Sequence, residues 1–191
     1  MTSQDRTAIS KRLSYVLRHR PDSIGIQLTE AGWTDVEQLL DGLALHGLPL
    51  SLYVLKEVVE TNPKRRFEFS PDGSEIRARQ GHSVDVDLGY EPVAPPRTLF
   101  HGTPEVSVES ILLTGLERRR RHHVHMSTDR HLMLDVARRR GAPALLKIDA
   151  GRMHDDGVEF FVTGNDVWLT EHVPPSYLSR ASDLGEMIPP A

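Results

Sequence analysis

The stretch "GYEPVAPPR", residues 89–97, separates two parts of the sequence that have different hydrophobic patterns. Its prolines, Pro92, Pro95 and Pro96, fix φ and disfavour the helical conformation in the residue before each of them. Proline-rich segments of this kind form stiff, extended linkers. We therefore expect an N-terminal lobe at residues 1–90, a linker at residues 91–97 and a C-terminal lobe at residues 98–191.

The part before the linker is predicted to form helices first and then a hairpin. Apolar residues recur three or four positions apart in residues 9–19, 34–47 and 51–61, which is the helical period. Residues 66–79 then alternate around the turn Pro71-Asp72-Gly73, as a hairpin does. Three short helices and a hairpin suggest a winged-helix lobe.

The ends of two of these helices have sequence signals of their own. Pro21 should end the first helix. Thr34 and Glu37 have capping-box spacing, so Thr34 is the expected N-cap of the second helix.

The part after the linker is predicted to be richer in strands. Short apolar segments predict strands at residues 98–103, 123–127, 144–149, 157–163 and 166–170. Helices are expected at residues 106–115, ended by Gly115, and at about residues 129–140. The expected class is α+β with a mixed or antiparallel sheet.

Composition and charge exclude several classes of protein. The 191 residues include no cysteine, so disulfides, thiol nucleophiles and cysteine metal sites are excluded. The net charge of -4 argues against a protein that coats nucleic acid nonspecifically. No apolar run reaches the length of a membrane span and the N-terminus lacks a signal peptide's apolar core, so we expect a cytoplasmic protein. Neither a G-x-G-x-x-G nor a P-loop motif occurs.

The basic stretch "ERRRRHHVHMS", residues 117–127, could be a phosphate clamp, a metal site or a solvated run. If a strand begins near its middle, alternation puts Arg121, His123 and His125 on one face and turns His122 away. A metal would need a third ligand, and no carboxylate or histidine has suitable local spacing. We therefore expect no metal, and a solvated approach at residues 118–120.

Two other basic motifs could bind phosphate. Arg18 and His19, in "LRHRP", are adjacent at the end of the first helix and could reach one phosphate from neighbouring directions. Taken alone, the motif is more simply explained as a cationic helix end that favours the macrodipole. Arg66 directly precedes Phe67 in "PKRRFEF", and alternation turns it away from the face that Phe67 occupies.

The motif "LFHGT", residues 99–103, ends a predicted strand with polar groups. Gly102 would let a ligand approach the backbone, and His101 and Thr103 can hydrogen-bond sugar hydroxyls. A buried histidine at a strand end is the alternative.

Taken together, these motifs resemble one family, the NAD-dependent RNA 2′-phosphotransferases of the KptA type. The resemblance runs through "KRLSYVLRHRP", "KRRFEF", "RARQGHS", "LFHGT", "RHHVHMS" and "NDVWLT", in that order, and covers nearly the whole chain. It implies an N-terminal winged-helix lobe that holds RNA and a C-terminal ADP-ribosyltransferase-like mixed β lobe that holds NAD.

The resemblance also implies a reaction and its residues. An internal RNA 2′-phosphate attacks the nicotinamide ribose of NAD, which is consumed, and ADP-ribose 1″,2″-cyclic phosphate is released. The implied catalytic residues are Arg18, His19, Arg66 and Arg121, with Arg120 as the alternative to Arg121. The implied NAD contacts are His101, Gly102, Thr103, His123, His125 and Ser127. A monomer that uses no metal is expected.

Two other functions stay open at this point. The protein could transfer ADP-ribose to a protein or a nucleic-acid end without removing phosphate. It could also be a non-catalytic winged-helix binder of nucleic acid, which the net charge of -4 disfavours.

Overall fold

The computed structural model describes residues 2–181. Residues 182–191, which belong to the predicted C-terminal lobe at residues 98–191, lie outside the described residues. The described residues form an α+β fold that divides into two compact units. The first unit consists of Met1–Tyr90 together with two short segments, Arg120–His122 and Thr163–Asn165. The second unit consists of the other residues from Glu91 onward. The sequence patterns did not indicate that the two short segments pack with the first unit.

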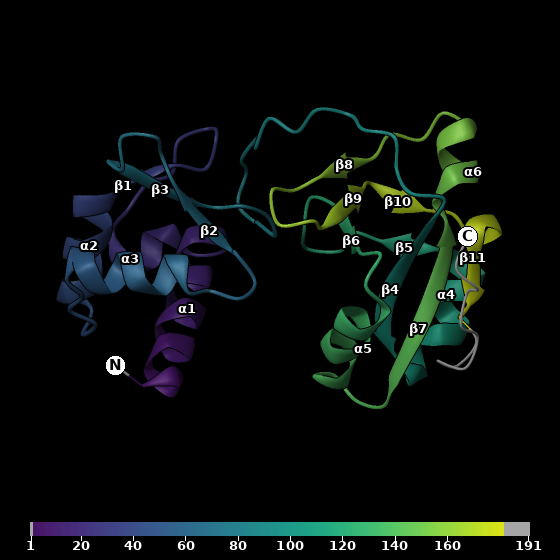
Figure 1. The fold of residues 1–191 in the computed structure, drawn as a ribbon, viewed down its shortest axis with the longest axis horizontal. Helices are drawn as coiled ribbons and strands as arrows, with labels where there is room; N and C mark the ends of the chain where they lie inside the picture. Colours follow the sequence, from purple (N-terminus) through teal and green to yellow (C-terminus); the bar gives the residue numbers. More distant parts are fainter. Residues whose placement is uncertain (1, 182–191) are drawn as a thin grey trace. The chain divides into compact units, whose positions relative to one another are not determined.

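The three predicted helices of the first unit are confirmed (Figure 1). They are α1 (Ser3–Arg18), α2 (Val36–Leu45) and α3 (Leu52–Glu60). Helix α1 begins before the apolar pattern because Thr2 caps it in a capping box with Asp5. It ends at Arg18, and the short 3₁₀ helix η1 (Pro21–Ile24) follows, as the proline predicted.

The predicted N-cap of α2 was wrong by one residue. Asp35 caps this helix, its side chain accepting the backbone N–H of Gln38 at 2.8 Å. Thr34 instead lies in the short strand β1 (Thr34–Asp35), where it pairs with Ile76. Asp35 is the last residue of β1, where it pairs with Glu75, and its extended backbone directly before the helix puts it at the N-cap, for which aspartate is a good residue.

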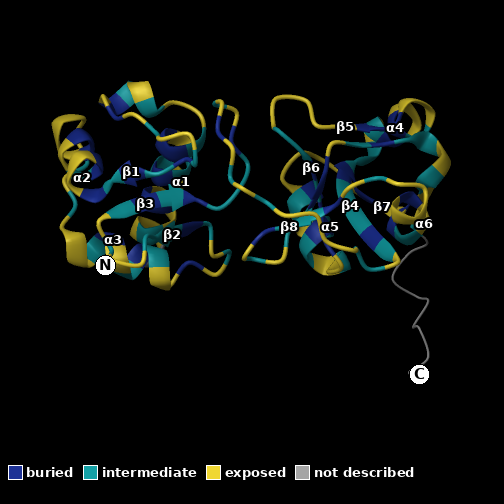
Figure 2. Cartoon of the chain, turned by 90° about the horizontal axis from the view of Figure 1, so that it is seen from above, coloured by how far each residue is buried: buried dark blue, intermediate teal, exposed yellow. Residues whose placement is uncertain are grey.

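The hairpin of the first unit is also confirmed. Strands β2 (Phe67–Phe69) and β3 (Glu75–Ala78) pair antiparallel, and β1 adds to the other edge of β3. Helix α1 contacts both α3 and β3, so the apolar faces of helices and hairpin share one core. Figure 2 shows buried residues along β3.

The second unit is built on antiparallel strands in its described part. The longest pair is β4 (Thr98–Pro104) and β7 (Pro143–Asp149), with β11 (Leu178–Arg180) on the other edge of β7. Strands β6 (Val124–Met126), β9 (Trp168–Thr170) and β8 (Phe161–Val162) form another sheet, and β5 (Leu116–Glu117) pairs with β10 (His172–Val173). Of the two expected sheet types, the structure has the antiparallel one.

The second unit contains the two predicted helices and one α-helix, α6 (Ala150–Asp155), that was not predicted. The predicted helix near Ser110 is η2 (Glu105–Ser107) followed by α4 (Val108–Thr114), and Gly115 ends it with φ 93°. Helix α5 (Arg130–Arg138) packs on β4 and β7. Helix α6 and the 3₁₀ helix η3 (Pro175–Tyr177) were not predicted, because so short a helix shows no clear period.

Three predicted strands, at residues 123–127, 157–163 and 166–170, are shorter than expected. Of residues 157–163 only Phe161 and Val162 are in a strand. Strand β6 begins at Val124, so Arg121 and His123 precede it in a bend. The alternation that was to put Arg121, His123 and His125 on one face therefore does not apply to Arg121 or His123. In the described part of the chain, no helix is long and apolar enough to cross a membrane.

Candidate active site

The end of helix α1 carries a buried guanidinium. Arg18 is the last residue of α1, and Gly81 lies against it: a Cβ on Gly81 would be 3.5 Å from Arg18 Nη1. Among the described residues, the Nε and Nη2 atoms of Arg18 are buried and have no hydrogen-bond partner. A buried donor without a partner is costly, so a site like this is suited to an anion that accepts several hydrogen bonds.

Three of the predicted catalytic residues influence one another electrostatically. Burial, and then the positive charges of Arg66 and Arg121, lower the pKa of Arg18 to about 10. The structure thus brings Arg18, Arg66 and Arg121 together in the first unit, although they are far apart in sequence. Like charges placed together are destabilising until an anion binds among them.

Arg66 and Arg121 both stand on irregular backbone. The carbonyl oxygen of Arg66 accepts the N–H of Arg79 at 2.9 Å, just before β2 begins. Its neighbour Arg65 has φ 41°, a left-handed conformation that is uncommon for a residue with a side chain. Arg121 lies in the bend before β6, and Arg119 also has a positive φ, 54°. Backbone strain of this kind concentrates at functional sites.

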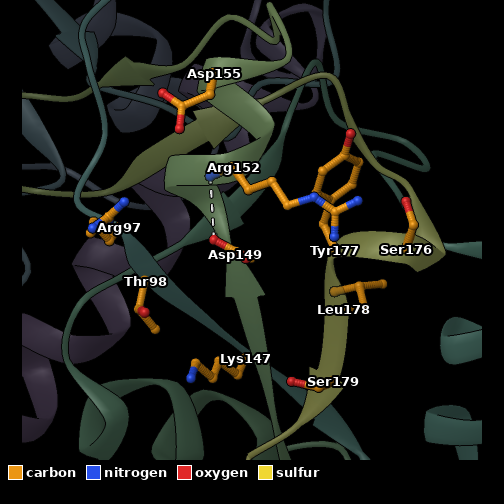
Figure 3. A pocket seen from close by; sticks show the side chains of 10 residues that line it. All are labelled: Arg97, Thr98, Lys147, Asp149, Arg152, Asp155, Ser176, Tyr177, Leu178 and Ser179. Atoms are coloured by element: carbon orange, nitrogen blue, oxygen red, sulfur yellow. Dashed lines mark hydrogen bonds between the residues drawn. The ribbon is translucent and has the colours of Figure 1, made fainter.

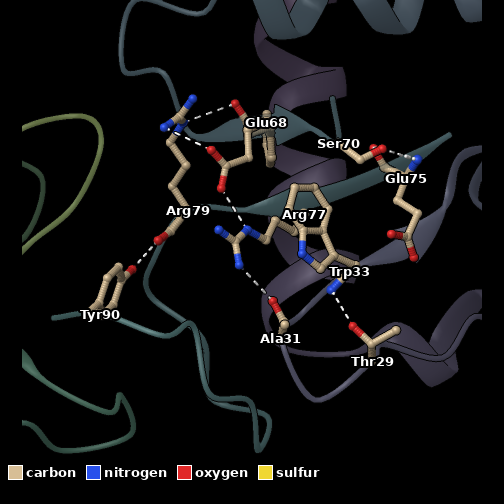
Figure 4. Close-up of polar contacts among 10 residues, drawn as sticks. Thr29, Ala31, Trp33, Glu68, Ser70, Glu75, Arg77, Arg79 and Tyr90 are labelled. Atoms are coloured by element: carbon tan, nitrogen blue, oxygen red, sulfur yellow. Dashed lines mark hydrogen bonds and ion pairs between the residues drawn. The ribbon is translucent and has the colours of Figure 1, made fainter. Parts of the chain in front are cut away.

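The other arginines of the hairpin are paired with an acid (Figure 4). Glu68 accepts from Arg77 Nε at 2.7 Å and lies 3.0 Å from Arg79 Nη1. The guanidinium of Arg77 also stacks 4.4 Å from the ring centre of Trp33, and the hydroxyl of Tyr90 donates to the carbonyl of Arg79. These partners mark Arg77 and Arg79 as structural cations, in contrast to Arg18.

His19 and His82 are the two histidines beside this cluster. Burial, followed by the charges of Arg18 and Arg121, lowers the pKa of His19. His82 is 2% exposed, and burial, then Arg18, lowers its pKa to about 3. Its ring nitrogens have no hydrogen-bond partner among the described residues. Both rings are therefore neutral at neutral pH in the absence of an anion.

The segment Thr163–Asn165 packs against the loop that carries Arg66, a contact that the sequence did not predict. Asn165 donates from Nδ2 to the carbonyl of Lys64 at 2.8 Å, which ties the segment Thr163–Asn165 to the loop before Arg66. A Cβ on Gly164 would lie 2.2 Å from Arg79 Nη1, so only glycine fits there without displacing that side chain. The motif "NDVWLT", which begins at Asn165, was a signal for this contact, but nothing in the sequence showed its partner.

Four of the predicted NAD residues lie together in the second unit. His101 Nδ1 is 2.8 Å from the carbonyl of His125, and His125 Nδ1 is 3.0 Å from the carbonyl of His123. The ring of His123 contacts Phe161 edge-on at 5.5 Å. Ser127 pairs with Phe100 through two backbone hydrogen bonds, which joins β4 to the end of β6.

The other residues predicted to contact NAD, Gly102 and Thr103, are packed against neighbouring parts of the second unit. Gly102 lies on the face of β4 that α5 covers, because a Cβ there would be 1.9 Å from the carbonyl oxygen of Met133. Its absent side chain thus has a packing reason, and its contact with NAD stays a prediction. Thr103 is buried, and the hydroxyl of Ser127 accepts the N–H of Asp129 at 3.1 Å, at the start of α5.

Within residues 2–181, the histidines do not form a metal site with their described neighbours. No three histidine or acidic side chains of residues 2–181 gather where they could hold a metal ion. His122 belongs to the first unit and His123 to the second.

A cavity of about 660 Å³ lies elsewhere in the second unit (Figure 3). Its lining is polar and comes from β4, β7, α6 and the segment from η3 to β11: Arg97, Thr98, Lys147, Asp149, Arg152, Asp155, Ser176, Tyr177, Leu178 and Ser179. Arg152 lies over the ring of Tyr177 at 4.8 Å. The lining includes three cationic and two acidic side chains, and none of the predicted site residues lines this cavity.

Comparison with known proteins matches most of the chain to one family. Residues 4–172 match the family described as "RNA 2′-phosphotransferase, Tpt1 / KptA family". A "Probable RNA 2′-phosphotransferase" of Agrobacterium fabrum is 51% identical over 177 residues, covering 93% of this chain and 95% of that protein. Proteins of the same name are 46% identical in Nostoc punctiforme and 47% identical in Burkholderia lata, with at least 93% of each chain covered.

Proposed function

The chain belongs to the RNA 2′-phosphotransferase, Tpt1/KptA family of transferases, and we propose that it transfers an internal RNA 2′-phosphate to NAD. The observation that carries this proposal is the buried guanidinium of Arg18, whose unpartnered Nε and Nη2 lie near the charges of Arg66 and Arg121. A phosphate with three terminal oxygens would satisfy these donors and offset the repulsion among the three cations.

In the proposed first step, a 2′-phosphate oxygen forms a bond to C1″ of the nicotinamide ribose and nicotinamide leaves. Arg18, Arg66 and Arg121 hold the phosphate and orient it toward the ribose. In the second step, the ribose 2″-hydroxyl attacks phosphorus and the RNA 2′-oxygen leaves. The proton of the 2″-hydroxyl passes to the leaving 2′-oxygen, and His19 assists this movement or donates a hydrogen bond to the phosphate.

The residues of the second unit suit NAD as the second substrate. The imidazoles of His101, His123 and His125 provide ring nitrogens that can hydrogen-bond ribose hydroxyls or an amide. His101 and His125 are held in place by backbone carbonyls, which supports a preformed site. We include Gly102, Thr103 and Ser127 in the proposed NAD site as the resemblance implies.

The proposed division of labour follows the two parts of the chain. Three helices and a hairpin support a winged-helix RNA lobe at residues 1–90, and antiparallel sheets with α5 support an ADP-ribosyltransferase-like NAD lobe at residues 98–191. Residues 91–97 are the proposed linker. We propose that the protein acts in the cytoplasm as a monomer.

A direct assay tests the proposed function. Pure protein is incubated with NAD and an oligoribonucleotide that carries one internal 2′-phosphate, with the same oligonucleotide lacking that phosphate as control. Nicotinamide, dephosphorylated RNA and ADP-ribose 1″,2″-cyclic phosphate are expected in equal amounts, and only from the phosphorylated RNA. A folded protein that releases no nicotinamide would contradict the proposal. Stable ADP-ribosylated RNA without cyclic phosphate would instead make it an ADP-ribosyltransferase.

A further inference from the structure

The segment Gly81–Ser83, which we call the strap, crosses the end of helix α1. The N–H groups of Ser83 and Val84 both donate to the carbonyl oxygen of Arg18, at 2.9 and 3.4 Å. The last carbonyls of a helix have no partner within the helix, so these bonds anchor the strap to α1. Gly81 has φ 85°, a conformation that favours glycine, and lies against the Arg18 side chain.

The strap also contacts the side chain of His19. The hydroxyl oxygen of Ser83 is 2.9 Å from His19 Nδ1. With Nδ1 occupied in this way, Nε2 is the ring nitrogen left to meet a ligand. Both side chains are exposed, so substrate can reach them.

A hydroxyl is a suitable partner for a ring that changes protonation state. It donates to Nδ1 when that nitrogen is the unprotonated one, and it accepts from Nδ1–H in the other tautomer or in the imidazolium. A carboxylate in the same place would favour the charged ring. The titratable groups around His19 are Arg18 and Arg121, which lower its pKa, and the neutral ring of His82.

We propose that Ser83 is a positioning residue: its hydroxyl holds the His19 ring by Nδ1, through both protonation states, so that Nε2 is presented to the RNA 2′-phosphate. This inference rests on the proposed function and adds to it a residue with no assigned role. Ser83 acts through His19 and does not itself touch the reacting atoms.

The test compares Ser83→Ala with Ser83→Thr, which restores a hydroxyl. Losing one hydrogen bond to the ring is expected to lower kcat about tenfold while KM for RNA changes by less than about threefold. Ser83→Thr should recover most of this loss. Ser110→Ala, an exposed serine on α4, is the matched control and should leave kcat unchanged. A Ser83→Ala enzyme with wild-type kcat would overturn the proposal.

A double-mutant cycle shows whether Ser83 works through His19. In a His19→Ala background, Ser83→Ala should cause no further loss of kcat. A full additional tenfold loss there would mean that Ser83 acts independently, and the proposal would be wrong.

A measurement without turnover separates this proposal from the proposed function. Nitrogen NMR of the His19 ring should show a hydrogen-bonded Nδ1 in the wild type and in Ser83→Thr, and loss of that hydrogen-bond shift in Ser83→Ala. An unchanged Nδ1 signal in Ser83→Ala overturns the positioning role even if the enzyme is active. A wild-type protein that releases no nicotinamide would overturn only the proposed function, because the NMR measurement tests the contact between Ser83 and His19 separately.

Discussion

Arg121 is the residue of the arginine run that the structure connects to the end of α1. It contributes to the lowered pKa of both Arg18 and His19, whereas Arg118, Arg119 and Arg120 do not. This supports the choice of Arg121 over Arg120 as the catalytic member of the run. All four arginines of the run are exposed, so exposure does not distinguish Arg121 from the other three.

Replacing Arg121 by alanine should therefore remove transition-state stabilisation without unfolding the protein. We expect kcat/KM to fall at least about a hundredfold, on the order of 3 kcal/mol, because a preorganised charge on the transferred phosphate is lost. Arg118→Ala is the control and should stay within about threefold of wild type. Equal losses in the two variants, or melting of Arg121→Ala at assay temperature, would show that Arg121 is not a specific catalytic charge.

The low pKa of the buried His82 predicts that the stability of the protein depends on pH. Its pKa is about 3 in the folded protein and near 6.5 when unfolded, so between these values the unfolded chain binds more protons. Stability should therefore fall as pH drops from 6.5 toward 3, at up to roughly 1.4 kcal/mol per pH unit.

Urea unfolding of wild type and His82→Gln between pH 4.5 and 7 measures this effect. Glutamine does not titrate, so the slope of unfolding free energy against pH should be smaller in the variant. His46→Gln, at an exposed position, is the matched control for a histidine-to-glutamine change. Parallel slopes for wild type and His82→Gln would mean that His82 is protonated equally in both states.

At the scale of elements, the packing of α5 on β4 depends on one glycine. A Cβ on Gly102 would meet the backbone oxygen of Met133 at 1.9 Å, and backbone atoms of a helix cannot yield as a flexible side chain can. The same strand carries His101 and Thr103 on its other face, so a shift of β4 would also disturb the proposed NAD contacts.

Gly102→Ala should thus destabilise the protein by roughly 2–4 kcal/mol, measured by urea unfolding. Gly157→Ala is a useful comparison, because that glycine has φ 92° but open space around it. Its cost should be about 1–2 kcal/mol, from the left-handed conformation alone. If Gly102→Ala is no worse than Gly157→Ala, the close contact with Met133 is not maintained in solution.

At the scale of the whole molecule, the proposed reaction assigns to arginine side chains the part that a metal ion has in many phosphoryl-transfer enzymes. No group of three candidate ligands occurs in residues 2–181, whereas three arginines lie close enough to affect one another electrostatically. Guanidinium groups can neutralise the developing charge on phosphorus in the way that magnesium otherwise does.

The enzyme should accordingly keep its turnover, within about twofold, after dialysis against EDTA and assay in chelator. Mass spectrometry of the same sample should find no stoichiometric metal. Loss of turnover that zinc, magnesium or manganese restores would contradict this prediction.

The sequence alone determined the helices of the first unit, the hairpin, the long strands β4 and β7 and the family motifs. These features depend on local periodicity and on turn residues, which a single stretch of chain displays. Weak or very short elements such as α6, β5 and β10 were missed because two to six residues show no period. The N-cap of α2 was misplaced because Thr34 and Asp35 are both good caps, and strand β1 extends through Asp35 before the helix begins.

Only the tertiary structure decided which side chains meet. That Arg18 is buried beside Arg66 and Arg121, that Ser83 contacts His19, and that Gly102 faces Met133 all depend on contacts between distant parts of the chain. Sequence spacing carries no information about such contacts. The motif "RARQGHS" was visible from the start, but the reason for its glycine and serine appeared only when the fold placed them across the end of α1.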